Sequence, residues 1–348
     1  MPSNPKTFID FNRAKANLKA VLEDERFSGI SFRPHFKTHR SAAVGELFSN
    51  EGIEKITVSS LPMAEYFADA GWKDILIAMP LNPNHVAQYD ALAARVQLHL
   101  LADHSDPLFF ALSHLKNPVG FFLKADAGYG RAGWLAENTR DFLRAAEMIS
   151  SFDRHSFSGI LSHFGNTYHA KSAEEIKAIN LSSITRLAVL KDFLETQTGK
   201  PCPLSIGDTP SLPHYSKEML KPVAELRPGN FIYYDMMQVA LGTCKTDEIA
   251  LAVETDILSL YPDRGEALVH AGAVHLSKEQ CRMPDGRPGS GALVRMTKNG
   301  IGEVIENCFV DRISQEHGIL RVAPAFFREF HIGDSIGILP VHSCLVEK

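Results

Sequence analysis

The sequence predicts an eight-stranded parallel (β/α)8 TIM barrel followed by an antiparallel β domain. Up to about residue 228, short apolar runs alternate with longer amphipathic segments, which is the pattern of parallel βα units. After about Met236 the chain becomes rich in strand-like runs separated by turn residues, which is typical of antiparallel sheets. The 348 residues suffice for two domains of this kind.

Eight short apolar runs carry the prediction of the barrel, because eight βα units close a barrel of this type. The predicted strands are Ile30–Arg33, Lys55–Ser59, Asp74–Ala78, Val96–Leu101, Val119–Lys124, Phe157–Ser162, Pro203–Ile206 and Val223–Leu226. The clearest helices between them are Pro62–Ala70 and Asn180–Thr198, where apolar residues recur at three- and four-residue spacing.

The second part predicts at least five strands joined by tight turns. They are Ile249–Tyr261, Ala267–His270, Ala292–Thr297, Phe309–Ser314 and Ser335–Leu339. The turn signals are Pro262-Asp263, Pro284-Asp285-Gly286 and Asn299-Gly300. Lys6–Asp10 is extended-looking and is expected to add a strand. We therefore expect a barrel over residues 12–236 and a β domain built from residues 1–11 and 237–348.

Composition excludes several classes of protein. The net charge is −5 without a basic block, so nucleic acid is not an expected partner. No apolar run has the length of a membrane span or of a signal-peptide core, so we expect a cytoplasmic protein without a membrane partner. Five scattered cysteines without a C-x-x-C pair argue against a disulfide framework and a cysteine-rich zinc module.

The segment Arg33–His39 follows the first predicted strand and places Lys37 between two histidines. His35 and His39 have the spacing of the zinc-protease helix, but the glutamate of that motif is missing and Pro34 disfavours a helix. A lysine beside cationic neighbours is expected to have a lowered pKa and to be a good nucleophile. From these residues alone, Lys37 is either a Schiff-base lysine or a solvated lysine at the barrel rim.

Lys124–Gly133, after the fifth strand, contains the pattern G-x-G-x-x-G. A dinucleotide fingerprint should open the first βα unit and have an acidic residue at the end of the next strand. Here Asp153 precedes the next apolar run instead of ending it. Turn glycines therefore explain the pattern better, and Arg131 becomes a cation near the barrel mouth.

Two further clusters follow predicted strands six and seven. His163 could be an acid–base group or an ordinary polar residue. Gly207, Asp208 and Thr209 could offer backbone N–H groups and a hydroxyl to a phosphate, since the loops after strands seven and eight commonly bind phosphate. A helix N-cap by Asp208 or Thr209 is the alternative.

His342 and Cys344 follow the last predicted strand. In an extended segment the two side chains lie on the same side. Imidazole and thiolate together suit zinc, and two protein ligands fit an open site completed by water or substrate. An unrelated His and Cys are the alternative from these residues alone.

Taken in order, these clusters resemble the D-serine dehydratase and D-threonine aldolase group of the fold-type III PLP enzymes, within the alanine-racemase-like superfamily. Arg-Pro-His-Phe-Lys-Thr-His over residues 33–39 is similar to the group's Schiff-base segment. Glu225–Asn230 and Ser314–Gly318 also look like signatures of the group. His342-Ser343-Cys344 resembles the metal pair of the dehydratases, whereas the aldolase branch more often has Asp as the second ligand. His-x-Gly-Asn-Thr-Tyr over residues 163–168 looks closer to the animal-type dehydratases.

The resemblance implies a homodimer in which a PLP-binding barrel carries a C-terminal β domain. It implies that Lys37 binds PLP and exchanges protons at the substrate's Cα, and that Arg131 faces the pyridine nitrogen. The other implied contacts are those of Tyr168, Gly207, Asp208 and Thr209 with the phosphate, and those of His342 and Cys344 with Zn²⁺.

The implied activity is that of a lyase acting on a small D-β-hydroxy amino acid. We expect D-serine to give pyruvate and ammonia, with Zn²⁺ assisting loss of the β-hydroxyl as a Lewis acid. The alternative is retro-aldol cleavage of a D-threonine-like substrate to glycine, with His163 as a possible base. An amino-acid racemase and a non-catalytic PLP-binding protein are the remaining readings.

Overall fold

The computed structural model describes residues 5–283, 285–298 and 300–346, and the chain divides into two compact units. One unit is Asp24–Gly229. The other joins the segment ending at Glu23 to the segment beginning at Asn230. The expected domain boundaries near residues 12 and 237 remain a prediction. Among the helices in the described ranges, none is long and apolar enough to cross a membrane.

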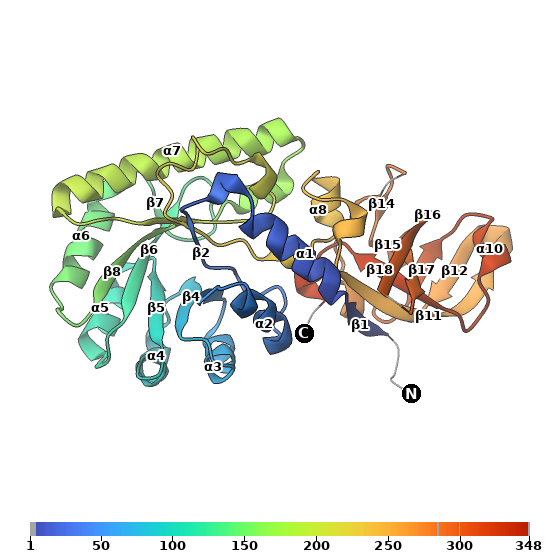
Figure 1. Ribbon diagram of the computed structural model, residues 1–348, viewed down its shortest axis with the longest axis horizontal. Coiled ribbons are helices and arrows are strands. Elements are labelled where there is room, and N and C mark those ends of the chain that lie inside the picture. Colours follow the sequence, from blue (N-terminus) through green and yellow to red (C-terminus); the bar gives the residue numbers. More distant parts are fainter. Residues whose placement is uncertain (1–4, 284, 299, 347–348) are drawn as a thin grey trace. The chain divides into compact units, whose positions relative to one another are not determined.

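The unit Asp24–Gly229 is the predicted (β/α)8 barrel (Figure 1). Its parallel strands neighbour one another in the order β2-β10-β9-β8-β6-β5-β4-β3. They are β2 (Ser31–Phe32), β3 (Lys55–Val58), β4 (Asp74–Pro80), β5 (Gln97–Ala102), β6 (Gly120–Asp126), β8 (Ser156–Leu161), β9 (Leu204–Ile206) and β10 (Glu225–Leu226). All eight predicted strands are confirmed.

The two ends of this sheet meet just after β2. A parallel bridge joins His35 to Thr57 of β3, and the Phe36 N–H donates to the Thr57 carbonyl at 2.8 Å. These contacts bring the barrel to near closure. The short strand β7 (Trp134–Leu135) pairs with the end of β6.

Six helices flank the barrel strands (Figure 1). They are α2 (Ala42–Asn50), α3 (Leu61–Asp69), α4 (Val86–Ala93), α5 (Ser105–His114), α6 (Thr139–Ser150) and α7 (Ala173–Thr198). The two predicted helices correspond to α3 and α7. Ser60 caps α3 before a proline in its first turn, and Ser172 caps α7, which ends at left-handed Gly199.

The second unit is a six-stranded antiparallel barrel in the order β11-β12-β17-β16-β15-β18, closed by pairing of β18 with β11. The strands are β11 (Leu251–Tyr261), β12 (Glu266–Val269), β15 (Gly291–Thr297), β16 (Gly300–Ile313), β17 (Gly318–Arg321) and β18 (Ser335–Pro340). The predicted N-terminal strand is β1 (Lys6–Ile9), which pairs with β11.

The smaller elements complete this unit. They are α1 (Phe11–Leu22), α8 (Met236–Ala240), α9 (Ala273–Leu276), α10 (Phe326–Glu329), β13 (Cys281–Arg282) and β14 (Pro288–Gly289). Helix α1 is fixed by buried Asn17, whose amide donates to the carbonyls of Ile232 and Glu248.

The sequence prediction was incomplete in the second unit. The run Phe309–Ser314 is only the second half of β16, and β17 was missed because a four-residue strand is too short to stand out. Two predicted turns include Pro284 and Asn299, which lie outside the described residues.

Candidate functional site

The predicted site residues of the barrel follow the carboxyl ends of its strands. Lys37 lies in a turn after β2, Arg131 after β6, His163 after β8, and Gly207 directly after β9. Because the carboxyl ends of parallel strands share one edge of the barrel, these residues meet at one mouth. Arg227, directly after β10, joins them there, although the sequence analysis did not select it as a site residue.

Lys37 is held by an anchored segment. The side chain of Phe36 is fully buried against Phe48, Phe67 and Trp72. The Lys37 N–H donates to Nδ1 of His35 at 3.3 Å. The aromatic anchor therefore fixes the backbone of Lys37 while its side chain stays half-buried.

The zinc-protease interpretation of this segment is excluded. The ring of His39 packs against Phe36 at a centroid distance of 4.3 Å and is fully buried. Burial lowers the pKa of His39 to about 3. His39 is therefore a neutral core residue and not a metal ligand.

His35 and His163 are neutral imidazoles in a cation-rich environment. Burial, followed by the charge of Lys37 and those of Arg131 and Arg227, holds the pKa of both histidines well below its usual range. The same three cations act on both rings, which indicates that the five side chains form one cluster. Such a cluster attracts an anionic ligand.

The tautomer of His163 follows from its hydrogen bond. Its Nδ1 lies 2.7 Å from the carbonyl oxygen of Gly207, which can only accept, so Nδ1 carries the proton. Nε2 of the neutral ring then keeps a lone pair and can take a proton.

The position of the His163 ring is also fixed by packing. Tyr129 packs edge-on against His163, and a Cβ at Gly165 would come within 2.4 Å of the Tyr129 ring.

The conformation of the glycine-rich loop after β6 is fixed by hydrogen bonds to the Asp126 carboxylate. The carboxylate accepts the N–H groups of Gly128, Tyr129 and Gly130 at about 2.9 Å. These N–H groups are therefore already used, which excludes the dinucleotide fingerprint. The loop presents the exposed guanidinium of Arg131, whose Cζ lies 5.1 Å from the centre of the Tyr129 ring.

The turn after β9 is rigid. Asp208 is buried and accepts the hydroxyls of Thr167 and Ser211 at 2.7 Å each. Burial raises the pKa of Asp208 to about 6, although these hydrogen bonds oppose the rise. The Asp208 side chain thus braces the turn, and only its backbone remains for a phosphate. Tyr168 lies half-buried in the neighbouring short helix Gly165–His169.

Two buried basic side chains at the mouth of the barrel were missed by sequence reasoning. Arg227 donates from Nε to the Ser205 hydroxyl at 2.7 Å and from Nη2 to the Ser162 carbonyl. Lys124 is buried on β6 and donates to the Ala125 carbonyl at 2.9 Å. Burial, followed by the charges of Arg227 and Arg131, lowers the pKa of Lys124 to about 7. The sequence signal that could have identified Lys124 is a basic residue within an otherwise apolar predicted strand.

In the second unit, the predicted metal ligand His342 follows β18. Its Nδ1 lies 3.0 Å from Oε2 of Glu279. Burial alone would lower the pKa of His342, but hydrogen bonding and charge from Cys344, with the charges of Asp235 and Glu279, raise it to about 9. Since Glu279 takes Nδ1, a metal ion would bind His342 through Nε2.

Cys344 and its loop are held by a buried network. The Asn230 amide donates to the Cys344 sulfur at 3.7 Å and to Asp235 at 2.6 Å. Asp235 also accepts the backbone N–H of Ser343 at 3.0 Å. Together these contacts fix the segment from 342 to 344. All five cysteines lie within the described residues, and they form no disulfide bond with one another.

Comparison with known proteins decides the family. Residues 9–236 match the alanine racemase N-terminal domain and residues 250–348 match a serine dehydratase domain. D-serine dehydratase from Dictyostelium discoideum is 32% identical over 91% of this chain and 84% of its own. This chain belongs to the fold-type III PLP enzymes. It is a PLP-dependent lyase, as the relatives of known activity are.

Solved structures agree with this family. D-threo-3-hydroxyaspartate dehydratase from Delftia sp. HT23 matches with a TM-score of 0.90 at 26% identity, over 99% of this chain and 92% of its own. D-threonine aldolase from Filomicrobium marinum matches with a TM-score of 0.84 over 99% of this chain and 89% of its own, and at 22% identity this likeness shows the fold alone.

The barrel mouth of this PLP enzyme fits its cofactor. PLP carries a phosphate, an aldehyde and a phenolic oxygen, so its site needs cations and an amine. Lys37, Arg131 and Arg227 provide both, and their charges reach the same two neutral imidazoles. The rigid turn at Gly207 leaves no room for a side chain, because a Cβ there would lie 2.6 Å from the carbonyl carbon of Arg227.

The second unit of the enzyme fits a metal ion at His342 and Cys344. A carboxylate on the far nitrogen of the imidazole is the arrangement that orients metal-bound histidines. A soft thiolate beside an imidazole matches Zn²⁺. Two protein ligands leave positions open for water or substrate, as in catalytic zinc sites.

Proposed function

We propose that this enzyme eliminates water from D-serine, and that one water then hydrolyses the released 2-aminoacrylate to pyruvate and ammonia. The observation that carries the proposal is the His342–Cys344 pair, whose side chains hydrogen-bond each other while Glu279 fixes the imidazole. In the family resemblance, His with Cys is the metal pair of the dehydratases, whereas Asp more often replaces the Cys in the aldolases.

Support for the metal role comes from a structural relative. D-threo-3-hydroxyaspartate dehydratase has been solved as a His-to-Ala variant and as a Cys-to-Ala variant in a metal-free form. The two substituted residues of that enzyme are two positions apart, and so are His342 and Cys344. We infer that His342 and Cys344 hold Zn²⁺, which would supply Lewis acidity and make a hydroxyl a better leaving group.

In the barrel, the proposed work of this chain is to bind PLP and to move a proton. Lys37 is the amine that binds PLP, and once the substrate amine has replaced it, Lys37 takes the proton from Cα. PLP, when bound, supplies delocalisation of the charge left at Cα. The Nε2 lone pair of His163 offers a second proton acceptor at the mouth.

The phosphate and the ring of PLP need separate partners. We propose that Tyr168 and the backbone of Gly207, Asp208 and Thr209 hold the phosphate. Arg131 is proposed to face the ring nitrogen, and a guanidinium there keeps that nitrogen unprotonated. A ring of this kind accepts charge weakly, so departure of the β-hydroxyl needs the help that a metal ion gives.

Retro-aldol cleavage is the alternative function. It would use the same residues, with His163 taking the proton of the β-hydroxyl, and it would give glycine. The neutral His163 favours this reading, because only an unprotonated imidazole can serve as that base. Cys344 favours dehydration.

The substrate class is proposed from the relatives, which are named for D-serine and D-threo-3-hydroxyaspartate. We also propose that the enzyme is a homodimer, as the family resemblance implies. The test is to incubate the PLP-loaded enzyme and Zn²⁺ separately with D-serine, L-serine and D-threo-3-hydroxyaspartate and to measure keto acid and ammonia. Keto acid from L-serine alone would contradict the proposal.

A further inference from the structure

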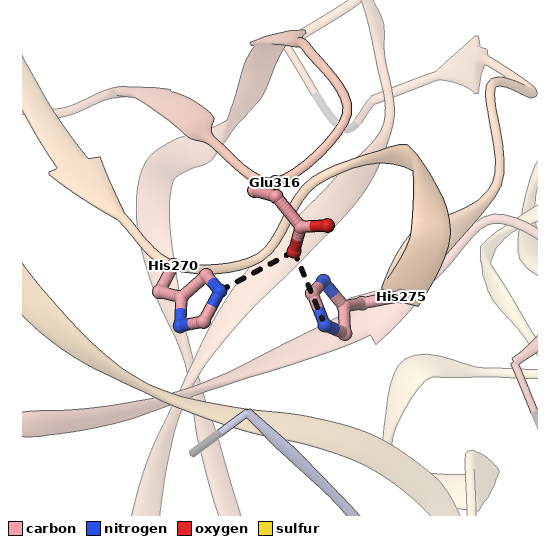
Figure 2. A group of neighbouring side chains, drawn as sticks. All are labelled: His270, His275 and Glu316. Carbon is pink, nitrogen blue, oxygen red and sulfur yellow. Dashed lines mark hydrogen bonds and ion pairs between the residues drawn. The ribbon is translucent and has the colours of Figure 1, made fainter. Parts of the chain in front are cut away.

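A second group of side chains that could bind a metal ion lies in the antiparallel unit, apart in sequence from His342 and Cys344. Figure 2 shows His270 and His275 pointing toward Glu316. His270 follows β12, His275 lies in α9, and Glu316 lies in the connection from β16 to β17. All three side chains are partly exposed.

The distances suit a common ion. Nε2 of His270 lies 3.4 Å from Oε2 of Glu316, and Nε2 of His275 lies 3.9 Å from the same oxygen. One ligand atom from each residue lies within 4.8 Å of the other two. Donors around a tetrahedral Zn²⁺ are about 3.3 Å apart, as follows from metal–ligand distances of about 2 Å. Small side-chain rotations therefore close the group around an ion.

The backbone holds the three residues together before any ion binds. The Ala273 N–H donates to the Ser314 carbonyl at 2.8 Å, and the Val274 N–H donates to the Gln315 carbonyl at 3.2 Å. A Cβ at Gly272 would lie 2.4 Å from the Gln315 carbonyl oxygen, so glycine is needed for this approach. The two ligand-bearing segments are thus one preorganised frame.

We propose that His270, His275 and Glu316 bind a divalent transition-metal ion, with Zn²⁺ as the best fit. Two imidazole nitrogens and one carboxylate oxygen are a ligand set for Zn²⁺. Partial exposure of all three side chains leaves the fourth position to water. The site clamps the segment after β12 to the β16–β17 connection.

One contact opposes binding. The Gly272 N–H donates to Nδ1 of His275 at 3.3 Å, so Nδ1 carries the lone pair and Nε2 the proton in the neutral ring. Binding at Nε2 moves this proton to Nδ1 and gives up the contact. The contact is longer than the usual range of about 2.7 to 3.2 Å, so its loss is a small cost. Without an ion, Glu316 lies within hydrogen-bond distance of His270 and within ion-pair distance of His275.

The two candidate metal sites differ in their ligands, which allows Co²⁺ to report on each. A thiolate ligand gives a charge-transfer band in the near ultraviolet, whereas imidazole and carboxylate ligands give only the weaker visible bands. Cys344→Ala removes the sulfur ligand. His275→Ala and Glu316→Gln alter the cluster proposed here.

The experiment titrates the PLP-loaded, chelator-stripped full chain with Zn²⁺ and Co²⁺ and counts tightly bound ions per chain. We expect two for the unaltered enzyme, one for Cys344→Ala, one for His275→Ala and for Glu316→Gln, and none for Cys344→Ala combined with His275→Ala. Cys344→Ala should lose the charge-transfer band and keep the visible bands. His331→Ala, an exposed histidine of the same unit paired with Asp334, should leave the count at two.

The proposal is overturned if His275→Ala and Glu316→Gln bind as many ions as the unaltered enzyme, or if Cys344→Ala binds none. Circular dichroism of each variant identifies loss of folding, and agreement between the two cluster variants guards against a single misfolded protein. If His342 and Cys344 do not bind a metal ion, the unaltered enzyme itself lacks the charge-transfer band. That result is distinguishable from loss of the ion at His270, His275 and Glu316.

Discussion

Nδ1 of His342 lies 3.0 Å from Oε2 of Glu279, 63 residues away in the sequence. The carboxylate fixes a proton on Nδ1, so the proposed metal ion would bind through Nε2. Glu279 is thus proposed as a positioning residue for the metal site. It lies between α9 and β13, and its backbone N–H donates to the Ser277 hydroxyl at 3.2 Å.

Substituting Glu279 should weaken metal binding. We expect Glu279→Ala to lower the Co²⁺ affinity of the thiolate site by roughly 10- to 100-fold, the usual effect of removing such a partner. Glu279→Gln should lose less, because its amide oxygen still accepts from Nδ1. The measurement is a titration of each variant with Co²⁺, followed by the near-ultraviolet charge-transfer band of the thiolate site. Glu329→Gln, in an exposed ion pair with Arg295, is the control, and equal affinities for all variants would refute the positioning role.

Replacing Lys37 should abolish binding of the cofactor as a Schiff base while leaving the fold intact. Lys37 is half-buried and lies in a turn that is anchored by Phe36. We expect Lys37→Ala to lose the visible absorption band of the PLP Schiff base and roughly 10²- to 10⁴-fold of kcat, the usual contribution of a general base. Lys73→Ala, an exposed lysine of the same unit, should keep both. A Lys37→Ala protein with the visible band would show that another lysine carries PLP.

Replacing Asp126 should disorder the loop that presents Arg131. The carboxylate accepts three N–H groups, and they hold its pKa below the usual value although burial opposes this. Asp126→Ala leaves these donors without a partner, at a cost of about 1 to 3 kcal/mol in the free energy of unfolding, and should weaken PLP binding. Asp153→Ala, exposed before β8, is the control. Unchanged PLP affinity in Asp126→Ala would show that the order of this loop does not contribute to PLP binding.

Lys124 predicts a specific pH dependence of stability in the PLP-free protein. Its pKa is lowered from 10.5 to about 7 in the folded state, so between these pH values the unfolded chain binds more protons and stability rises with pH. Lys124→Met removes the titrating group, so this contribution to the pH dependence of stability is lost. The variant should therefore be more stable than the unaltered protein near pH 7, and the difference in the free energy of unfolding should shrink by up to about 1.4 kcal/mol for each pH unit between pH 7 and 10.

Urea unfolding at several pH values measures this difference. Lys73→Met supplies the matched control, since its side chain is exposed, and its difference from the unaltered protein should not change with pH. A constant difference for Lys124→Met would mean that Lys124 is not held as a buried neutral amine.

The sequence predicted the barrel because each strand is a distinct apolar run bounded by turn residues. It also placed Lys37, Arg131 and His163 at one mouth, since parallel strands end at the same edge. The specific partners were not predictable. Contacts such as that of His163 with the Gly207 carbonyl join distant segments, and no local pattern encodes them.

The same limit explains the residues that were missed. Arg227 was visible within a family signature, but only the barrel shows that it is buried beside Lys124 and Ser205. Glu279 and Glu316 stand in sequence as ordinary charged residues. Their meeting with histidines depends on the register of the antiparallel strands.

The products formed from D-serine and D-threonine by the PLP- and Zn²⁺-loaded enzyme test the central claim most directly. Dehydration predicts pyruvate from D-serine and 2-oxobutanoate from D-threonine, each with one equivalent of ammonia, and loss of both after chelation of the metal. Release of glycine and an aldehyde without keto acid would contradict dehydration and establish retro-aldol cleavage instead.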